Sequence, residues 1–310
     1  MKIFNVQHST LDLQWRAFAR TPRVGRSKFN VRCLFLILLV LPALFAANLH
    51  ASDLPWQRVV VIGASASAGF VFSEPFGGRE TTRCKLNYYL DAAIAAPHPP
   101  VKNLATPLVF MNPEAIAPLQ IEAATNARPT LVIGVDFLFW FCYGDADGDA
   151  ARARRFEHGL KLLDQIHCPL VVGDIPDASC ATNTGIIGGR QVPSEAARRA
   201  ANQRLKEWAA AHPQVVVVPL ANFMRAMMAN ADFKLHGKTL PAGKTRALLQ
   251  ADELHPNPQG AAVLALCILD RLVSRQPEFP AADVRWNPAE VFRIGCKSAG
   301  MANKPQPAGE

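Results

Sequence analysis

The sequence predicts an α/β protein built as a three-layer α/β/α sandwich. Two observations lead to this fold class. Short apolar segments rich in β-branched residues alternate with longer amphipathic segments, and the chain contains no internal repeat. Buried parallel strands are short continuous apolar runs, and the crossover helices cover both faces of their sheet. We therefore expect a flavodoxin-like parallel five-stranded sheet, with ligands bound beyond the carboxyl ends of its strands.

Five segments are predicted as the strands. They lie at residues 58–62, 101–104, 130–135, 169–172 and 215–219. Helical patterns lie between and after them, at residues 81–95, 114–126, 149–165, 194–211, 221–230 and 258–274. This regular alternation favours a doubly wound sheet over a barrel or a helical bundle.

The positive charge is concentrated at the beginning of the chain. The formal net charge is +8, and residues 1–32 contain seven Lys and Arg residues against the single acid Asp12. The remaining residues are close to neutral, and no basic stripe is interleaved with aromatic residues. The composition therefore argues against a nucleic-acid partner.

An apolar run of about 15 residues, 33–47, follows this basic flank. That is the length of a signal-peptide core and is short for a bilayer span of about 20 residues. We expect an exported domain, periplasmic or secreted, whose membrane contact is limited to this segment; an uncleaved inner-membrane anchor is the alternative. The expected organisation is a leader at 1–51, one domain at 52–275, and a Pro-, Ala- and Lys-rich tail at 276–310 that wraps the surface and then frays.

The first strand ends in a loop of small residues that contains two serines. Val59 to Ile62 are all β-branched, and residues 63–69 read GASASAG. Gly63 and Gly69 allow the backbone to crowd around Ser65, leaving its hydroxyl and nearby N–H groups exposed beyond the strand end. Ser65 is therefore a candidate nucleophile.

The second candidate segment is residues 252–257, DELHPN, near the end of the predicted domain. Asp252 precedes His255 by three residues, which can place its carboxylate beside the imidazole Nδ1 and free Nε2 to deprotonate a serine. Pro256 stiffens the backbone after the histidine, and Asn257 is suited to cap the following helix.

These two segments resemble the first and last sequence blocks of the SGNH/GDSL hydrolases, in the same order along the chain. The resemblance implies the SGNH hydrolase fold, with Ser65 as nucleophile, His255 as general base and Asp252 as its orienting partner. It also implies that the Ser65 backbone N–H belongs to the oxyanion hole. No cofactor is required for this chemistry.

Three positions depart from the family pattern. Ala64 replaces the aspartate of the first block, the loop after the second predicted strand contains no glycine, and Asp136 stands where the family has an oxyanion-donating Asn. An ionised Asp cannot donate a hydrogen bond. Asp136 is therefore protonated in an apolar pocket or has another task, or backbone N–H groups alone form the oxyanion hole.

Substrate-binding candidates follow the third and fourth predicted strands. The aromatic run at residues 137–143 supplies Phe137 and Trp140, which either wall an acyl pocket or belong to the core. Asp174 follows the fourth strand, where it either contacts substrate or closes a turn.

No metal site is expected from the spacing of Cys, His and acidic residues. The acidic segment 144–149 departs from the EF-hand pattern, and an acid-rich helix start accounts for it. A phosphate-binding loop at residues 63–69 fits neither dinucleotide nor P-loop spacing. Six cysteines follow the leader and allow 15 pairings, among which the sequence does not choose.

We therefore expect a serine esterase that cleaves a small-molecule or glycan carboxylic ester. Two alternatives stay open: an O-acyltransferase or deacetylase acting on a cell-envelope glycan, and a binding protein that keeps the fold without turnover. Asp136 and the glycine-free second loop favour the non-catalytic alternative.

Overall fold

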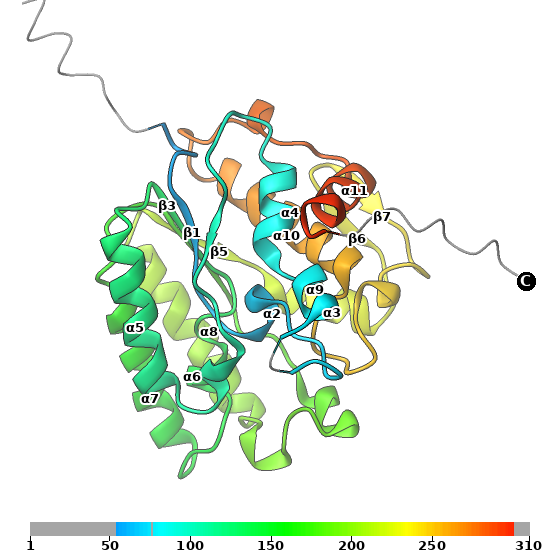
Figure 1. Ribbon diagram of the computed structural model, residues 1–310. Helices are drawn as coiled ribbons and strands as arrows, with labels where there is room; N and C mark the ends of the chain where they lie inside the picture. Colours follow the sequence, from blue (N-terminus) through cyan, green and yellow to red (C-terminus); the bar gives the residue numbers. More distant parts are fainter. Residues whose placement is uncertain (1–53, 76, 301–310) are drawn as a thin grey trace, which may run out of the picture. The chain divides into compact units, whose positions relative to one another are not determined.

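The structure is a computed structural model that describes residues 54–75 and 77–300 (Figure 1). Five parallel strands form its main sheet in the order β2-β1-β3-β4-β5. They are β1 (Val59–Val61), β2 (Lys102–Asn103), β3 (Leu131–Gly134), β4 (Leu170–Gly173) and β5 (Val215–Val218). The predicted flavodoxin-like α/β/α sandwich, which the SGNH/GDSL resemblance also implies, is confirmed.

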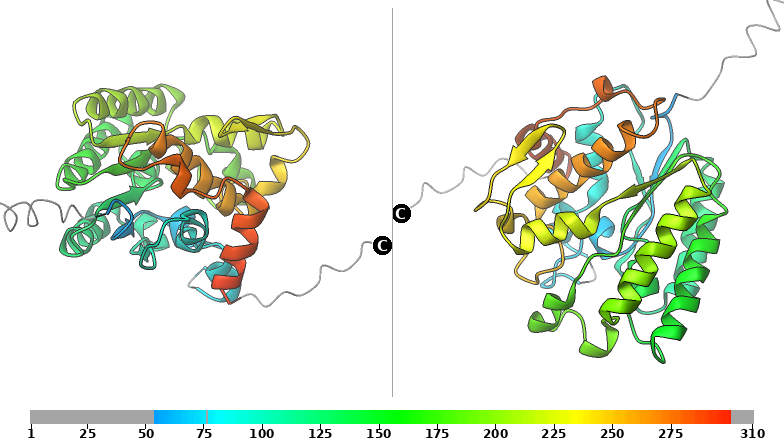
Figure 2. Two further views of the ribbon diagram at one scale, coloured as in Figure 1. Left: turned by 90° about the horizontal axis from the view of Figure 1, so that it is seen from above. Right: turned by 180° about the vertical axis from the view of Figure 1, so that it is seen from behind.

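Helices cover both faces of this sheet (Figure 2). One layer contains α4 (Leu86–Ala93), α9 (Leu220–Met228), α10 (Pro258–Val273) and α11 (Pro288–Ser298), and the other contains α5 (Pro113–Asn126), α7 (Asp149–Leu163) and α8 (Glu195–Ala210). The short helices are α2 (Ser65–Ala68), α3 (Arg79–Arg83) and α6 (Phe139–Cys142). Short 3₁₀ segments are η1 (Pro107–Phe110), η2 (Ser179–Thr184), η3 (Gly189–Gln191), η4 (Arg246–Leu248) and η5 (Ala281–Asp283).

Alternate side chains of each strand enter different hydrophobic cores. Val59 and Val61 pack with α4 and α10, whereas Val60 and Ile62 pack with α5 and α7. This is the period of two that every strand imposes on its side chains. Since both faces are covered, β1, β3, β4 and β5 consist of apolar residues and glycine, as the sequence pattern predicts, whereas the edge strand β2 is the polar pair Lys102–Asn103.

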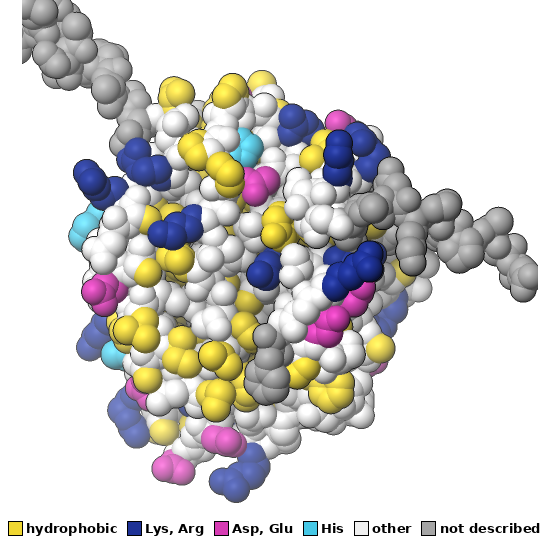
Figure 3. All heavy atoms as spheres, viewed as in Figure 1, with side chains coloured by type: hydrophobic (Ala, Val, Ile, Leu, Met, Phe, Trp, Pro, Cys, Tyr) yellow, Lys and Arg dark blue, Asp and Glu magenta, His cyan; other side chains and the backbone are white. Residues whose placement is uncertain are grey.

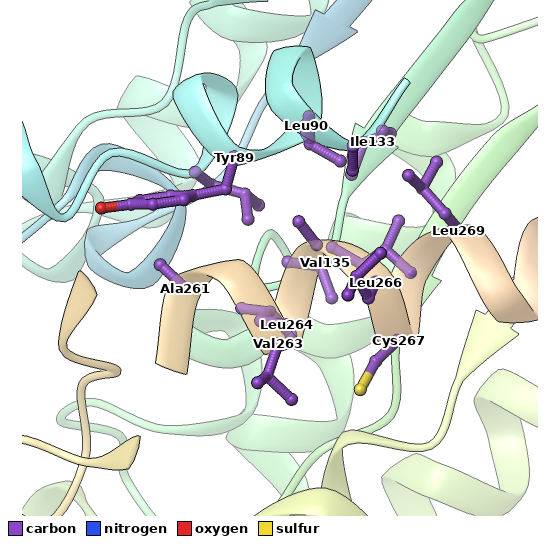
Figure 4. Close-up of a cluster of buried hydrophobic side chains, with 14 of the residues drawn as sticks. Tyr89, Leu90, Ile133, Val135, Ala261, Val263, Leu264, Leu266, Cys267 and Leu269 are labelled. Carbon is purple, nitrogen blue, oxygen red and sulfur yellow. The ribbon is translucent and has the colours of Figure 1, made fainter. Parts of the chain in front are cut away.

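Helix α10 supplies much of the first core. Eleven of its residues are buried, and Leu266 and Leu269 pack beside Leu90 of α4 and Ile133 of β3 (Figure 4). Asn257 caps this helix by accepting a hydrogen bond from the Gly260 N–H at 3.0 Å, as predicted. The cap fixes the helix start directly after His255.

The helix predicted at 81–95 is instead two helices, α3 and α4. The helical conformation is interrupted at Lys85, whose backbone is extended (φ −62°, ψ 125°). Gly69 packs against the backbone here, and a Cβ on Gly69 would lie 2.5 Å from the Lys85 nitrogen. The loop that follows Ser65 therefore occupies the space at this break.

Two features after β5 lie outside the sequence prediction. A hairpin of β6 (Phe233–Leu235) and β7 (Lys238–Leu240) follows α9. Residues 276–300 form η5 and α11, whose Val291 is fully buried against the first core. This part of the expected tail thus belongs to the folded domain.

The predicted leader lies outside the described residues. Among residues 54–75 and 77–300, no helix has both the length and the apolar character needed to span a bilayer. Lys and Arg side chains are dispersed among acidic and apolar ones on the face drawn in Figure 3.

Candidate active site

Ser65 begins helix α2, directly beyond the carboxyl end of β1. The turn between them is made by Gly63, whose φ of +135° disfavours any residue with a side chain. A Cβ at this position would also lie 2.1 Å from Asp136 Oδ1. Gly63 therefore lets the loop after β3 approach the serine loop.

His255 faces Ser65 from the loop before α10. Its Nε2 lies 2.8 Å from Ser65 Oγ, and its Nδ1 lies 2.7 Å from Asp252 Oδ2. The other carboxylate oxygen, Oδ1, accepts hydrogen bonds from the backbone N–H groups of Leu254 and His255 at 3.0 and 2.9 Å. The three predicted side chains thus form one continuous hydrogen-bonded chain.

The residues around the Ser65–His255–Asp252 hydrogen bonds keep Asp252 ionised and hold the His255 imidazole in place. Burial raises the pKa of Asp252, but the hydrogen bonds and charge of His255 outweigh burial and hold that pKa below its ordinary value. The Phe70 ring packs on the imidazole with ring centroids 4.7 Å apart. His255 itself is only 3% exposed.

The second serine of the loop, Ser67, is held by Asp136. Its backbone N–H donates to Oδ2 at 3.0 Å and its hydroxyl donates to Oδ1 at 2.6 Å. Asp136 therefore accepts hydrogen bonds at the position where the resemblance places a donor. The N–H groups of Ser65 and Ala66 start α2, and neither donates a hydrogen bond to another residue in the described part of the chain.

Two glutamines that the sequence analysis did not single out hold the loops of the site. Gln120 of α5 clamps Gly63, donating to its carbonyl at 2.9 Å and accepting from its N–H at 2.7 Å. Gln250 donates through Nε2 to the carbonyls of Phe70 and Pro256 at 2.8 and 3.0 Å, which joins the serine and histidine loops. Gln120 had a signal in the sequence, because it is a polar residue on the apolar face of its helix.

A cavity of about 70 Å³ opens beside Ser65 and His255. Its wall is apolar, with Phe139 and residues of α9 and α10. Both Ser65 and His255 are among the described residues that line this cavity. The groups predicted to react therefore lie at the edge of an apolar space.

The three predicted substrate contacts do not line this cavity. Phe137 is fully buried beside Phe141, and Trp140 packs edge-on against Phe139 with centroids 5.1 Å apart, both in the second core. Of the aromatic run, Phe139 faces the cavity, because the single turn of α6 points its neighbours elsewhere. Asp174 accepts a hydrogen bond from the Ala221 N–H at 2.7 Å and so holds the first turn of α9.

The six cysteines of the described chain are unpaired in this structure. Burial raises the pKa of Cys84 and of Cys142 to about 12, so both thiols stay protonated at neutral pH. No group of three or more His, Cys, Asp or Glu side chains within the described residues is arranged to hold a metal ion.

Fold and site together define an α/β protein with a Ser–His–Asp hydrogen-bonded chain beyond its first strand. Among solved structures, the chain is similar to the lipase/acylhydrolase of Enterococcus faecalis, with a TM-score of 0.49 and 18% identity over 74% of this chain and 99% of that protein. It is also similar to the protein YXIM of Bacillus subtilis, with a TM-score of 0.42 and 14% identity over 70% of this chain and 56% of that protein. No family model and no curated protein matches the sequence.

Proposed function

We propose that this protein is a serine esterase that cleaves a carboxylic ester through an acyl-enzyme. The observation that carries the proposal is the pair of short contacts around His255, 2.8 Å to Ser65 Oγ and 2.7 Å to Asp252 Oδ2. A serine is a weak nucleophile until a base removes its proton, and an ionised carboxylate holds that base in the required tautomer.

In this mechanism Ser65 Oγ attacks the ester carbonyl while its proton passes to His255 Nε2. The resulting imidazolium gives the proton to the departing alcohol, which leaves an acyl group on Ser65. A water molecule, deprotonated by the same imidazole, then releases the carboxylic acid and restores the serine. Asp252 stays ionised and stabilises the imidazolium in both halves of the reaction.

The tetrahedral oxyanion requires hydrogen-bond donors near Ser65. The backbone N–H groups of Ser65 and Ala66 are suited to this role, since they open α2 next to the nucleophile. Both oxygens of the Asp136 side chain accept hydrogen bonds from Ser67, so we assign it no donor role there.

Hydrolysis of p-nitrophenyl butyrate by the purified protein tests this proposal. We expect turnover in the wild type and its loss in Ser65→Ala and His255→Ala, with thermal unfolding nearly unchanged. The matched control is His236→Ala, because His236 Nδ1 pairs with Asp270 at 3.0 Å outside the site.

A fluorophosphonate probe provides the second measurement. Covalent labelling at Ser65 in the wild type, with none in Ser65→Ala, supports the nucleophile assignment. Folded wild-type protein that neither turns over ester nor reacts with the probe would refute the proposal and favour a non-catalytic binding protein. Transfer of the acyl group to an added sugar in preference to water would favour the acyltransferase alternative.

A further inference from the structure

One helix supplies four of the residues that line the cavity beside Ser65. α9 presents Leu220, Phe223, Met224 and Met227 to it. These residues have the spacing i, i+3, i+4 and i+7, so they lie on one face of the helix. Between Leu220 and Met227 the helix rises about 10 Å, which gives the cavity an elongated apolar side.

The polar side chains of the cavity are those of the reaction site. Apart from Ser65, Asp136 and His255, every described residue that lines it is apolar. A sugar bound there would bury hydroxyl groups against methionine and phenylalanine without hydrogen-bond partners, which is unfavourable. A hydrocarbon chain gains from the same surface, because it leaves water.

The size of the cavity limits the length of that chain. Its volume is about 70 Å³. A water-sized group occupies about 10–15 Å³ on this measure, and a methylene is of similar size, so about five to seven such groups fit. Met224 and Met227 line the cavity and are only 8% and 3% exposed, so other parts of the protein pack against both side chains.

We infer that this cavity is an acyl pocket for medium-chain esters, with acyl groups of about four to eight carbons. Met224 and Met227 determine the upper limit of chain length. The inference rests on the proposed function, since Ser65 must attack the carbonyl at the head of the chain. Methionine is flexible and adapts to an irregular chain, which suits this position.

The first test is the chain-length profile of kcat/KM with p-nitrophenyl acetate, butyrate, hexanoate, octanoate, laurate and palmitate. We expect a maximum between butyrate and octanoate and a fall of at least about tenfold at laurate. Met227→Ala removes three heavy atoms from the wall and should raise the laurate-to-butyrate ratio by about tenfold. The matched control is Met228→Ala, because Met228 is the next residue of α9 and does not line this cavity.

A Ser65-dependent activity with a flat profile, or with a maximum at acetate, would overturn the inference while leaving the esterase proposal intact. Equal changes of the profile in Met227→Ala and Met228→Ala would overturn the role of the α9 methionines.

Binding provides a test that needs neither turnover nor a substitution in α9. Ser65→Ala protein is heated with methyl acetate, methyl hexanoate or methyl palmitate, and the unfolding temperature is measured. We expect a rise with hexanoate and none with acetate or palmitate, because ligand binding to the native state stabilises it. No rise with any of them excludes the acyl pocket. A rise with hexanoate, when the wild-type protein hydrolyses no ester, refutes the esterase proposal alone.

Discussion

Asp136 accepts two hydrogen bonds from Ser67, one from its backbone N–H at 3.0 Å and one from its hydroxyl at 2.6 Å. The carboxylate thereby ties the loop after β3 to the helix that begins with Ser65. Both oxygens of the Asp136 carboxylate accept hydrogen bonds from Ser67. This contact explains why an aspartate stands at this position although it donates no hydrogen bond. It also places a negative group beside the cavity in which an oxyanion would form.

Asp136→Asn should keep or raise esterase activity. The amide oxygen can still accept from the Ser67 N–H and the amide nitrogen can donate to the Ser67 hydroxyl, while the negative charge is removed from beside the oxyanion. We expect kcat/KM on the butyrate ester to equal or exceed that of the wild type, with a loss of about 1 kcal/mol in urea unfolding. Asp136→Ala, which leaves both Ser67 groups unpaired, should lose about 1–3 kcal/mol. A folded but inactive Asp136→Asn protein would show that the charge itself is needed.

Asp252→Asn should lower kcat by about 10⁴-fold with little change in the fold. An asparagine NH₂ facing Nδ1 favours the tautomer with its proton on Nε2, which cannot accept the proton of Ser65. Steady-state kinetics on the butyrate ester measure the effect, with Asp270→Asn as the matched control in the His236–Asp270 pair outside the site. A loss of only a few-fold would remove Asp252 from the mechanism.

Asp252 should also make stability depend on acid. Burial raises the pKa of Asp252, but the hydrogen bonds from His255 and Leu254 lower it by more than burial raises it. The pKa in the folded protein is therefore below the unfolded value of about 3.9. The stabilisation is then fully present above the unfolded pKa and is lost as pH falls through the folded pKa. The difference in unfolding free energy between wild type and Asp252→Asn should therefore shrink from neutral pH to about pH 3. A difference that is constant over this range would contradict the shift.

Gly63→Ala should destabilise the protein and abolish its activity. The added Cβ would lie 2.1 Å from Asp136 Oδ1, at a residue whose φ is +135°. Gly243→Ala is the control that measures backbone strain without a steric clash. Gly243 has φ +86°, and no atom of the described residues lies near the position of an added Cβ. We expect Gly243→Ala to cost about 1 kcal/mol and Gly63→Ala to cost about 1–3 kcal/mol more in urea unfolding. Equal losses would mean that the serine loop moves away from Asp136 without penalty.

Cys180 should react first among the described cysteines. It is exposed, whereas Cys84 and Cys142 are buried and have pKa values raised by burial to about 12. Alkylation needs the thiolate, so native protein treated with iodoacetamide should be labelled rapidly at Cys180 and slowly at the buried thiols. Peptide mass spectrometry before and after denaturation measures the order, and equal native labelling of Cys84 and Cys180 would contradict it.

The sequence by itself determined most of the sheet and the Asp252–His255 half of the hydrogen-bonded chain. Four apolar segments became β1, β3, β4 and β5, because burial on both faces requires continuous apolar runs, and the polar Lys102–Asn103 became the edge strand β2. Asp252, His255 and Asn257 are three and two residues apart, so their mutual geometry is local and follows from the turn before α10. Such short-range relationships can be recognised without knowing where the rest of the chain lies.

Only the tertiary structure decided which serine meets the histidine and which aromatic ring meets the cavity. Ser65 and Ser67 occupy the same small-residue loop, and the contact that distinguishes them joins residues 190 apart in sequence. All three rings belong to the second core, but Phe139 also lines the cavity with residues of α9, whereas Phe137 and Trp140 do not. These outcomes depend on contacts between distant segments, and the local pattern of a segment does not specify its neighbours in space.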